Sequence, residues 1–225
     1  MYYKAYDDRY RQYHALTSSS WAEDKPSKVL IDILNDCGAN LDADILEIGC
    51  GEGQNALFLM ENGYRVTATD VSAEAIDWCK TQAKKRGLDA SKFFVLDILN
   101  TAYDKKFDVV LSVSTLHMLV LDRDRKGFWD FVYKHLNEGG VAIVTVMGDG
   151  EYVQNNTDIT KAFDLVTRKD KFGKEVNVAS TSCRIVNWKM LFDEIDASNL
   201  KVERNFLSEE IEGFSTSMVV VVTKK

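Results

Sequence analysis

The sequence predicts an α/β fold with a doubly wound, mainly parallel sheet. Short apolar segments with strand character alternate with amphipathic segments of helical length, and this alternation is typical of βαβ units. A glycine-rich turn follows the first apolar segment, and an acidic residue ends the second. Because crossovers between parallel strands are right-handed, helices are expected on both faces of the sheet. The 225 residues fit a single domain, residues 1–225.

Residues 1–40 are predicted to form an N-terminal helical cap. Tyrosines recur there at spacings of three and four residues and therefore share one helix face: Tyr3, Tyr6, Tyr10 and Tyr13. The single proline, Pro26, is expected to open a second helix, because proline is tolerated in a first helical turn.

The central region carries the alternating elements. Predicted strands cover residues 45–48, 64–69, 92–96, 107–113 and 141–147, and predicted helices cover residues 55–61, 74–86 and 123–136. Ser72 is a good N-cap for the helix over 74–86, since its hydroxyl can accept a hydrogen bond from a free backbone N–H.

The pattern weakens after residue 147. Residues 148–187 are polar and are interpreted as an insertion that forms a lid over the open end of the sheet. Residues 188–197 are predicted to be helical, and residues 200–207 and 214–223 to be the strands of a closing antiparallel hairpin. The hairpin would complete a seven-stranded sheet.

Composition excludes several classes of protein. The net charge of −7 argues against a nucleic-acid partner, which requires a basic face. The apolar runs are too short to span a membrane, and no signal peptide is evident, so a cytoplasmic location is expected. The four cysteines form no C-x-x-C pair, which argues against a zinc site and a disulfide scaffold, and no metal site is predicted. The sequence leaves the oligomeric state open.

The chemistry is expected at the glycine-rich turn. The run Glu47-Ile48-Gly49-Cys50-Gly51-Glu52-Gly53 follows a predicted strand and opens a helix. Glycines at alternate positions let the backbone turn sharply and approach a ligand closely. Asp70 ends the next strand, about 20 residues further on, where an acid can accept hydrogen bonds from both hydroxyls of a ribose. These features predict the nucleoside-binding half of a doubly wound sheet.

The spacing argues against a nicotinamide cofactor. The dinucleotide fingerprint G-x-G-x-x-G/A fails because Gln54 occupies its last position. The carboxylate of Glu47 is unfavourable beside a pyrophosphate but suits a ligand that carries a sulfonium and an ammonium. A charged residue in a buried parallel strand is also rare, which favours a functional role for Glu47.

At these residues the sequence resembles the class I S-adenosylmethionine-dependent methyltransferases, which have a Rossmann-like fold. The first motif spans residues 45–53, and Thr69-Asp70-Val71-Ser72 resembles the acidic loop after the second strand. Leu96-Asp97-Ile98 resembles the third motif, and residues 107–112 with Leu116-His117-Met118-Leu119 resemble the fourth. Residues 136–140 resemble the turn before the fifth strand, with Glu138 in place of the usual proline. The resemblance covers roughly residues 41–147.

The resemblance implies roles for matching positions. Gly49, Cys50 and Gly51 would line the methionine part of the cofactor, with Gly53 completing the turn and Ser112 nearby. Asp70 would hold the ribose, Val71 would pack on the adenine, and Asp97 and Ile98 would contact the adenine edge. Asn55 resembles the tellurite-resistance and thiopurine branch, which methylates small molecules.

Three other side chains are candidates. His117 follows the fourth strand and is a candidate general base, the alternative being that it hydrogen-bonds the local backbone. The aromatic stripe of the cap is a candidate lid over the sulfonium, with Tyr13 and Trp21 as the expected participants, the alternative being core packing.

The predicted function is transfer of a methyl group to a small molecule by in-line displacement. A negatively charged chain is expected to suit a neutral or cationic acceptor better than a phosphorylated one. The alternatives are a protein or nucleic-acid methyltransferase on the same fold, and a protein that binds the cofactor without turnover as a sensor. Methyltransferases that act on the amino groups of nucleic-acid bases carry an N/D-P-P-Y-like tetrapeptide after the fourth strand. This chain has Ser112-Val113-Ser114-Thr115 there, which disfavours methylation of bases.

Overall fold

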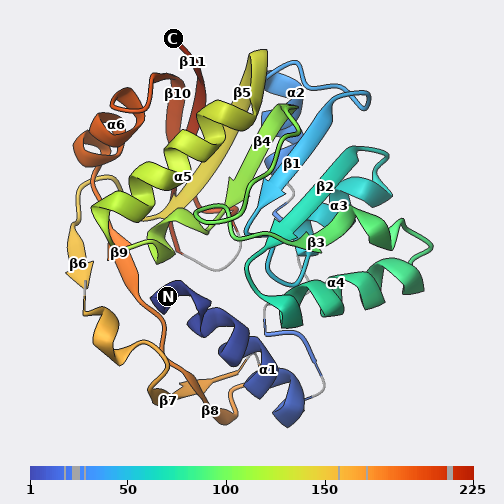
Figure 1. Cartoon of the computed structure of the whole chain (residues 1–225), viewed down its shortest axis with the longest axis vertical. Coiled ribbons are helices and arrows are strands. Elements are labelled where there is room, and N and C mark those ends of the chain that lie inside the picture. The colour runs from blue at the N-terminus through green and yellow to red at the C-terminus, as the bar shows by residue number, and fades with distance from the viewer. Residues whose placement is uncertain (18, 22–25, 28, 157, 171, 212–214) are drawn as a thin grey trace.

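The computed structural model describes residues 1–17, 19–21, 26–27, 29–156, 158–170, 172–211 and 215–225. A seven-stranded sheet forms its centre, in the order β10-β11-β5-β4-β1-β2-β3 (Figure 1). Its strands are β1 (Asp44–Ile48), β2 (Arg65–Asp70), β3 (Phe93–Val95), β4 (Phe107–Val113), β5 (Leu136–Met147), β10 (Leu200–Ser208) and β11 (Ser217–Lys224).

The sheet confirms the predicted fold class. Strands β1 to β5 pair in parallel, whereas β11 runs antiparallel to both β5 and β10. The predicted closing hairpin is therefore present, with β11 inserted between β5 and β10. Phe214, where the prediction began the last strand, lies outside the described residues, and β11 begins at Ser217.

Helices cover both faces of the sheet. One face packs against α2 (Val29–Asp36), α3 (Gln54–Glu61) and α4 (Ala73–Lys85), and the other against α5 (Asp122–His135) and α6 (Trp188–Asp196). Alternation along β1 shows why both faces are apolar: Ile45 packs on the first side, while Leu46 and Ile48 pack on the second. Among the described residues, no helix is both long and apolar enough to cross a membrane.

The Ser72 cap agrees with the prediction, whereas two element boundaries differ from it. The Ser72 hydroxyl accepts a hydrogen bond from the Ala75 N–H and caps α4, as predicted. Pro26 lies outside α2, which begins only at Val29, so the prediction that proline opens this helix is wrong. Strand β5 begins at Leu136 rather than at residue 141, because Leu136 pairs with Phe107 on β4 ahead of a register shift.

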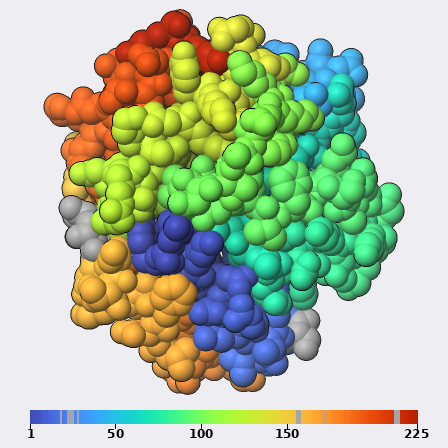
Figure 2. Space-filling model, viewed as in Figure 1, coloured from blue at the N-terminus to red at the C-terminus, as the bar shows by residue number. Residues whose placement is uncertain are grey.

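A second layer lies over the carboxyl ends of the parallel strands. It consists of η1 (Tyr2–Lys4) and α1 (Ala5–Thr17) with two small antiparallel sheets, which pair β6 (Gln154–Asn156) with β9 (Cys183–Ile185) and β7 (Leu165–Lys169) with β8 (Glu175–Ala179). We call this layer the roof. The polar insertion thus forms short antiparallel strands, and Figure 2 shows it (orange) beside the N-terminal residues (blue). The remaining short helices are η2 (Ala90–Lys92), η3 (Leu116–Met118) and η4 (Ile159–Lys161).

Helix α1 is tied to both the roof and the sheet side. On the roof side, the Arg9 Nε–H donates to the Ala179 carbonyl (3.0 Å), and the Ala179 N–H donates to Oε1 of Gln12 (2.6 Å). On the sheet side, Asp7 accepts hydrogen bonds from the Ser72 hydroxyl (2.8 Å) and the Glu74 N–H (3.0 Å) at the start of α4. Helix α1 therefore bridges the roof and the N-terminus of α4.

His14 strengthens the sheet-side attachment. Its Nε2 lies 2.7 Å from a carboxylate oxygen of Glu52, its Nδ1 lies 2.7 Å from one of Glu74, and its ring stacks on Trp78 with centroids 4.5 Å apart. Burial by itself lowers the pKa of His14, but the hydrogen bonds and charges of the two carboxylates outweigh it and raise the pKa above its usual value. Protonated His14 donates to both acids.

This geometry predicts pH-dependent docking of α1. Because the pKa of His14 is higher in the folded protein, its stabilisation is fully present below the unfolded-state pKa and is lost as pH rises through the folded-state pKa. We expect His14→Gln to lower the free energy of unfolding more at about pH 6 than at about pH 9, as measured by urea denaturation. His135→Gln is the control with the opposite expected trend, since burial lowers the pKa of His135. An equal effect of His14→Gln at both pH values would contradict the prediction.

Candidate functional site

A cavity of about 650 Å³ lies between the sheet and the roof. Its floor comes from the loops that follow β1, β2, β3 and β4, and its cover comes from α1 and the segment around β7 to β9. Loops at the carboxyl ends of parallel strands are where open α/β sheets bind ligands, and the volume falls within the range of small-molecule sites. The predicted site therefore coincides with a cavity built by both layers.

The glycine turn needs its glycines for two reasons. Gly49 has φ +69° and Gly51 has φ +53°, conformations that favour glycine. A Cβ on Gly49 would lie 2.3 Å from Oγ1 of Thr115, and one on Gly51 would lie 2.9 Å from the Tyr10 hydroxyl oxygen. The bare backbone of the turn, together with Cys50, lines the cavity.

Asp70 connects the glycine turn to the loop after β2. Its Oδ2 accepts a hydrogen bond from the Gly51 N–H (2.8 Å), and its Oδ1 accepts one from the Ser72 N–H (2.9 Å). Burial raises the pKa of Asp70, although the amides of Ser72, Gly51 and Val71 oppose this rise. Each oxygen keeps a second lone pair, so the carboxylate can hold its loops and still accept hydrogen bonds from a ligand.

Glu47 is a buried carboxyl group at the cavity floor. It is only 1% exposed and lies on β1, beside Asn55 of α3. Burial raises the pKa of Glu47 to about 8, although hydrogen bonding from Asn55 and the Ala56 amide lowers it and the nearby Asp70 raises it further. Among the described residues, none forms a hydrogen bond with its Oε2. A buried acid of this kind suits a cationic ligand group.

Asp97 borders the cavity together with Ile98 and Val71, but the N-terminal residues already engage its carboxylate. The Tyr3 hydroxyl donates to it at 3.2 Å, and the Lys4 ammonium lies 3.4 Å from Oδ2. The N-terminal cap and the loop after β3 therefore contact each other at this end of the cavity.

His117 lines the cavity from η3. Burial, with a smaller contribution from the charge of Arg125, lowers the pKa of His117 to about 4. The guanidinium of Arg125 is itself held by Glu194 of α6 (2.7 Å and 2.9 Å) and by the Leu116 carbonyl (2.9 Å). At neutral pH the imidazole is therefore uncharged and a weak base, poorly matched to general-base catalysis.

Three of the candidate residues do not line the cavity. Gly53 faces Cys79 and the core at the start of α3. Ser112 is fully buried, and its hydroxyl donates to the Ile48 carbonyl (3.3 Å), so it joins β4 to β1. Tyr13, expected in the lid, is 0% exposed and packs against Val176, Val178 and Trp21, because its turn of α1 faces the β8 strand.

The lining of the cavity shows which aromatic residues of the predicted stripe reach it, and it adds residues that the sequence analysis did not choose. Tyr6 and Tyr10 face the cavity in place of Tyr13, while Trp21 lines it as expected. Arg9, on the same helix, and Thr115, after β4, also line it. The three- and four-residue spacing of the tyrosines was the available signal for this face, but it does not show which turn of α1 overlies the cavity.

Ser114 is a strained residue of the same lining. It has φ +55°, although it is not a glycine, and its N–H donates to the Thr145 carbonyl (3.1 Å). Its buried hydroxyl forms no hydrogen bond with any described residue. Strain of this kind is common at ligand sites.

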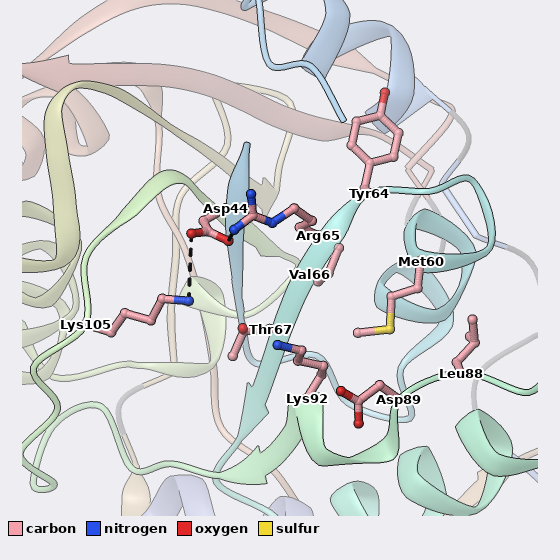
Figure 3. Close-up of a pocket in the computed structure, with 10 residues that line it drawn as sticks. All are labelled: Asp44, Met60, Tyr64, Arg65, Val66, Thr67, Leu88, Asp89, Lys92 and Lys105. Carbon is pink, nitrogen blue, oxygen red and sulfur yellow. Dashed lines mark ion pairs between the residues drawn. The ribbon is translucent and has the colours of Figure 1, made fainter. Parts of the chain in front are cut away.

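A second hollow, of about 330 Å³, lies at the opposite, amino ends of β1 and β2 (Figure 3). There the Asp44 carboxylate oxygens lie 2.8 Å from the Arg65 guanidinium and 3.9 Å from the Lys105 ammonium. The charges of these three side chains are therefore largely paired with one another. No cluster of His, Cys, Asp or Glu suited to a metal ion occurs in the part of the chain that the structure describes. The cavity under the roof is the better ligand site.

Comparison with known proteins agrees with this geometry. Residues 45–140 match a family described as a methyltransferase domain. A 2-heptyl-1-hydroxyquinolin-4(1H)-one methyltransferase of Mycobacteroides abscessus is 29% identical over 127 residues, which are 56% of this chain and 55% of that protein. A probable S-adenosyl-L-methionine-dependent methyltransferase, TehB, of Haemophilus influenzae is 30% identical over 101 residues, which are 44% and 34% of the two chains. The chain thus spans about half or less of the length of these curated relatives.

A solved structure extends the likeness to the whole fold. The CcbJ methyltransferase from Streptomyces caelestis superposes with a TM-score of 0.69 at 16% sequence identity, covering 97% of this chain and 98% of that one. The matched family region contains the glycine turn, Asp70, Asp97 and His117. Residues 45–140 are thus similar in sequence to a methyltransferase domain, and the whole chain shares its fold with a solved methyltransferase.

Proposed function

We propose that the protein transfers a methyl group from S-adenosylmethionine to a small-molecule acceptor held beneath the roof. The observation that carries the proposal is the buried floor of the cavity, where Glu47 and Asp70 flank a glycine turn with an open backbone. The methyltransferases similar in sequence include one whose name specifies a small quinolone.

The residues present fit the cofactor at both of its polar ends. Asp70 has free lone pairs for ribose hydroxyls, and Val71 and Ile98 offer apolar surface for the adenine. Glu47 has an oxygen without a hydrogen bond among the described residues, which suits the ammonium of the methionine part. Gly53 and Ser112 support this site from behind, by packing and by a hydrogen bond to Ile48.

The role of the chain in the reaction is positioning and exclusion of water. When bound, S-adenosylmethionine supplies a methyl group already activated by the sulfonium charge. The glycine turn and Asp70 fix the donor half of the cavity, while Tyr6, Tyr10 and Trp21 cover it and limit the entry of water. An acceptor that is a good nucleophile needs no strong base at this site, which agrees with the neutral state of His117.

Enclosure supports a small acceptor over a macromolecule. The cavity is bounded by α1 and the β7–β8 hairpin, which are joined through Ala179. A folded protein or a nucleic-acid duplex cannot enter such a cavity without displacing this roof. We also propose that residues 1–225 act as one domain and that the roof serves as its lid.

Binding and turnover test the proposal directly. Calorimetry is expected to show binding of both S-adenosylmethionine and S-adenosylhomocysteine, with Asp70→Ala weakening each at least about tenfold, or about 1.4 kcal/mol. A methyl-release assay across a panel of small phenols, amines and thiols is expected to find turnover. Binding without turnover on any acceptor would instead favour a sensor, and absence of binding would end the proposal.

Glu47 predicts that cofactor binding releases a proton. With its pKa near 8, the carboxyl group is mostly protonated at pH 7, and a cationic ligand favours the ionised form. Calorimetry at pH 7 in two buffers of different ionisation enthalpy is expected to show proton release for the natural protein and almost none for Glu47→Gln. Glu61→Gln, on the exposed end of α3, is the control and is expected to behave as the natural protein. Equal proton release from Glu47→Gln and the natural protein would contradict this role.

His117 predicts a modest effect on catalysis. Since its imidazole is neutral above about pH 5, we expect His117→Gln to reduce kcat by less than about tenfold and to leave the pH–rate profile between about pH 6 and 9 unchanged. Steady-state rates at saturating cofactor measure both quantities. A loss of about 100-fold or more, with an altered profile, would identify His117 as the general base after all.

A further inference from the structure

Charges of opposite sign occupy opposite walls of the cavity. The carboxyl groups of Glu47, Asp70 and Asp97 lie along its floor, on the loops that follow β1, β2 and β3. Arg9 of α1 and Arg168 of β7 line it from the roof. The floor suits the positive charges of the methyl donor, so the roof arginines require a different explanation.

Arg9 is buried and only partly used by the protein. It is 8% exposed, and its Nε–H donates to the Ala179 carbonyl at 3.0 Å. Its guanidinium carbon lies 5.3 Å from the centroids of both the Tyr6 and Trp21 rings. The two terminal NH₂ groups of the planar fork form no hydrogen bond with any described residue. They are therefore available to a ligand in the cavity.

Arg168 adds a second positive charge without neutralising the first. Burial lowers the pKa of Arg9, and the charge of Arg168 lowers it further. In the described part of the chain, neither arginine forms an ion pair with a carboxylate. A buried cation without an anionic partner costs free energy, and a second cation nearby adds to that cost. An anionic ligand would remove both costs.

We propose that the methyl acceptor is a planar small molecule with a carboxylate, which Arg9 and Arg168 bind while Tyr6 and Trp21 pack against its ring system. This inference rests on the proposed function and specifies its substrate class. A guanidinium fork matches the geometry of a carboxylate, and the Tyr6 and Trp21 rings, which contact Arg9, also line the cavity where a planar body would lie.

The position of the arginines favours the carboxylate of the acceptor over that of the donor. The donor groups lie at the ends of β1 to β3, whereas Arg9 is fixed to β8 and Arg168 belongs to β7. The roof strands and α1 lie outside the family match, and acceptor selectivity is expected to reside in such added segments. The net charge of −7 favoured a neutral or cationic acceptor. The two roof arginines instead make this wall of the cavity positive, which favours an anionic acceptor.

Benzoate and its uncharged analogue benzamide test the inference by calorimetry, on the free protein and on the protein saturated with S-adenosylhomocysteine. We expect benzoate to bind at least tenfold more tightly than benzamide. We expect Arg9→Gln and Arg168→Glu each to weaken benzoate at least tenfold while changing the affinity for S-adenosylhomocysteine less than threefold. Arg9→Lys, which keeps the charge, is expected to restore part of the benzoate affinity.

Controls separate the outcomes. Arg123→Gln, on α5 with a side chain 80% exposed, is expected to bind both compounds as the natural protein does. Because Arg168 is exposed, Arg168→Glu leaves the fold intact even if Arg9→Gln loosens α1. Equal affinity for benzoate and benzamide, or no binding of benzoate, would overturn the inference. If the arginine substitutions weakened S-adenosylhomocysteine as much as benzoate, the arginines would belong to the donor site and the inference would also fail. Benzoate binding without any S-adenosylhomocysteine binding would sink the proposed function and leave the anion site standing.

Discussion

Two hydrogen bonds to one buried carboxylate hold the centre of the site together. The Asp70 carboxylate accepts hydrogen bonds from the N–H groups of Gly51 and Ser72. It therefore joins the glycine turn after β1 to the loop that precedes α4. Because Gly51 belongs to a left-handed turn beneath Tyr10, a shift of this carboxylate would also move the contact between turn and cap. The floor of the cavity, the start of α4 and the seat of α1 all depend on this link.

Two buried ionisable side chains without a partner of opposite charge in the described part of the chain determine the electrostatics of the cavity. Glu47 is a carboxyl group kept largely protonated by burial, and Arg9 is a guanidinium without an acidic partner among the described residues. Each costs free energy in the absence of ligand, and each is stabilised when a group of opposite charge is bound. Buried polar groups of this kind make the cavity a candidate ligand site.

Helix α1 connects the floor of the cavity to the roof through its opposite sides. Asp7 and His14 bind the glycine turn and α4, while Arg9 and Gln12 bind β8 of the roof. The aromatic residues between these contacts cover the cavity. One short helix therefore joins the two layers that enclose the cavity, and its docking is expected to depend on the protonation of His14.

The sequence by itself determined the βαβ order, the glycine turn, Asp70 and Glu47, because these depend on local periodicity and on residues a few positions apart. It also indicated the closing hairpin. Only the tertiary structure decided that β11 lies between β5 and β10, and that α1 turns Tyr13 toward β8 and Tyr10 toward Gly51. It also decided that Arg9 and Arg168, about 160 residues apart in the chain, line the same cavity. Pairing between distant segments is set by which surfaces bury one another, and that choice leaves no periodic signal within either segment.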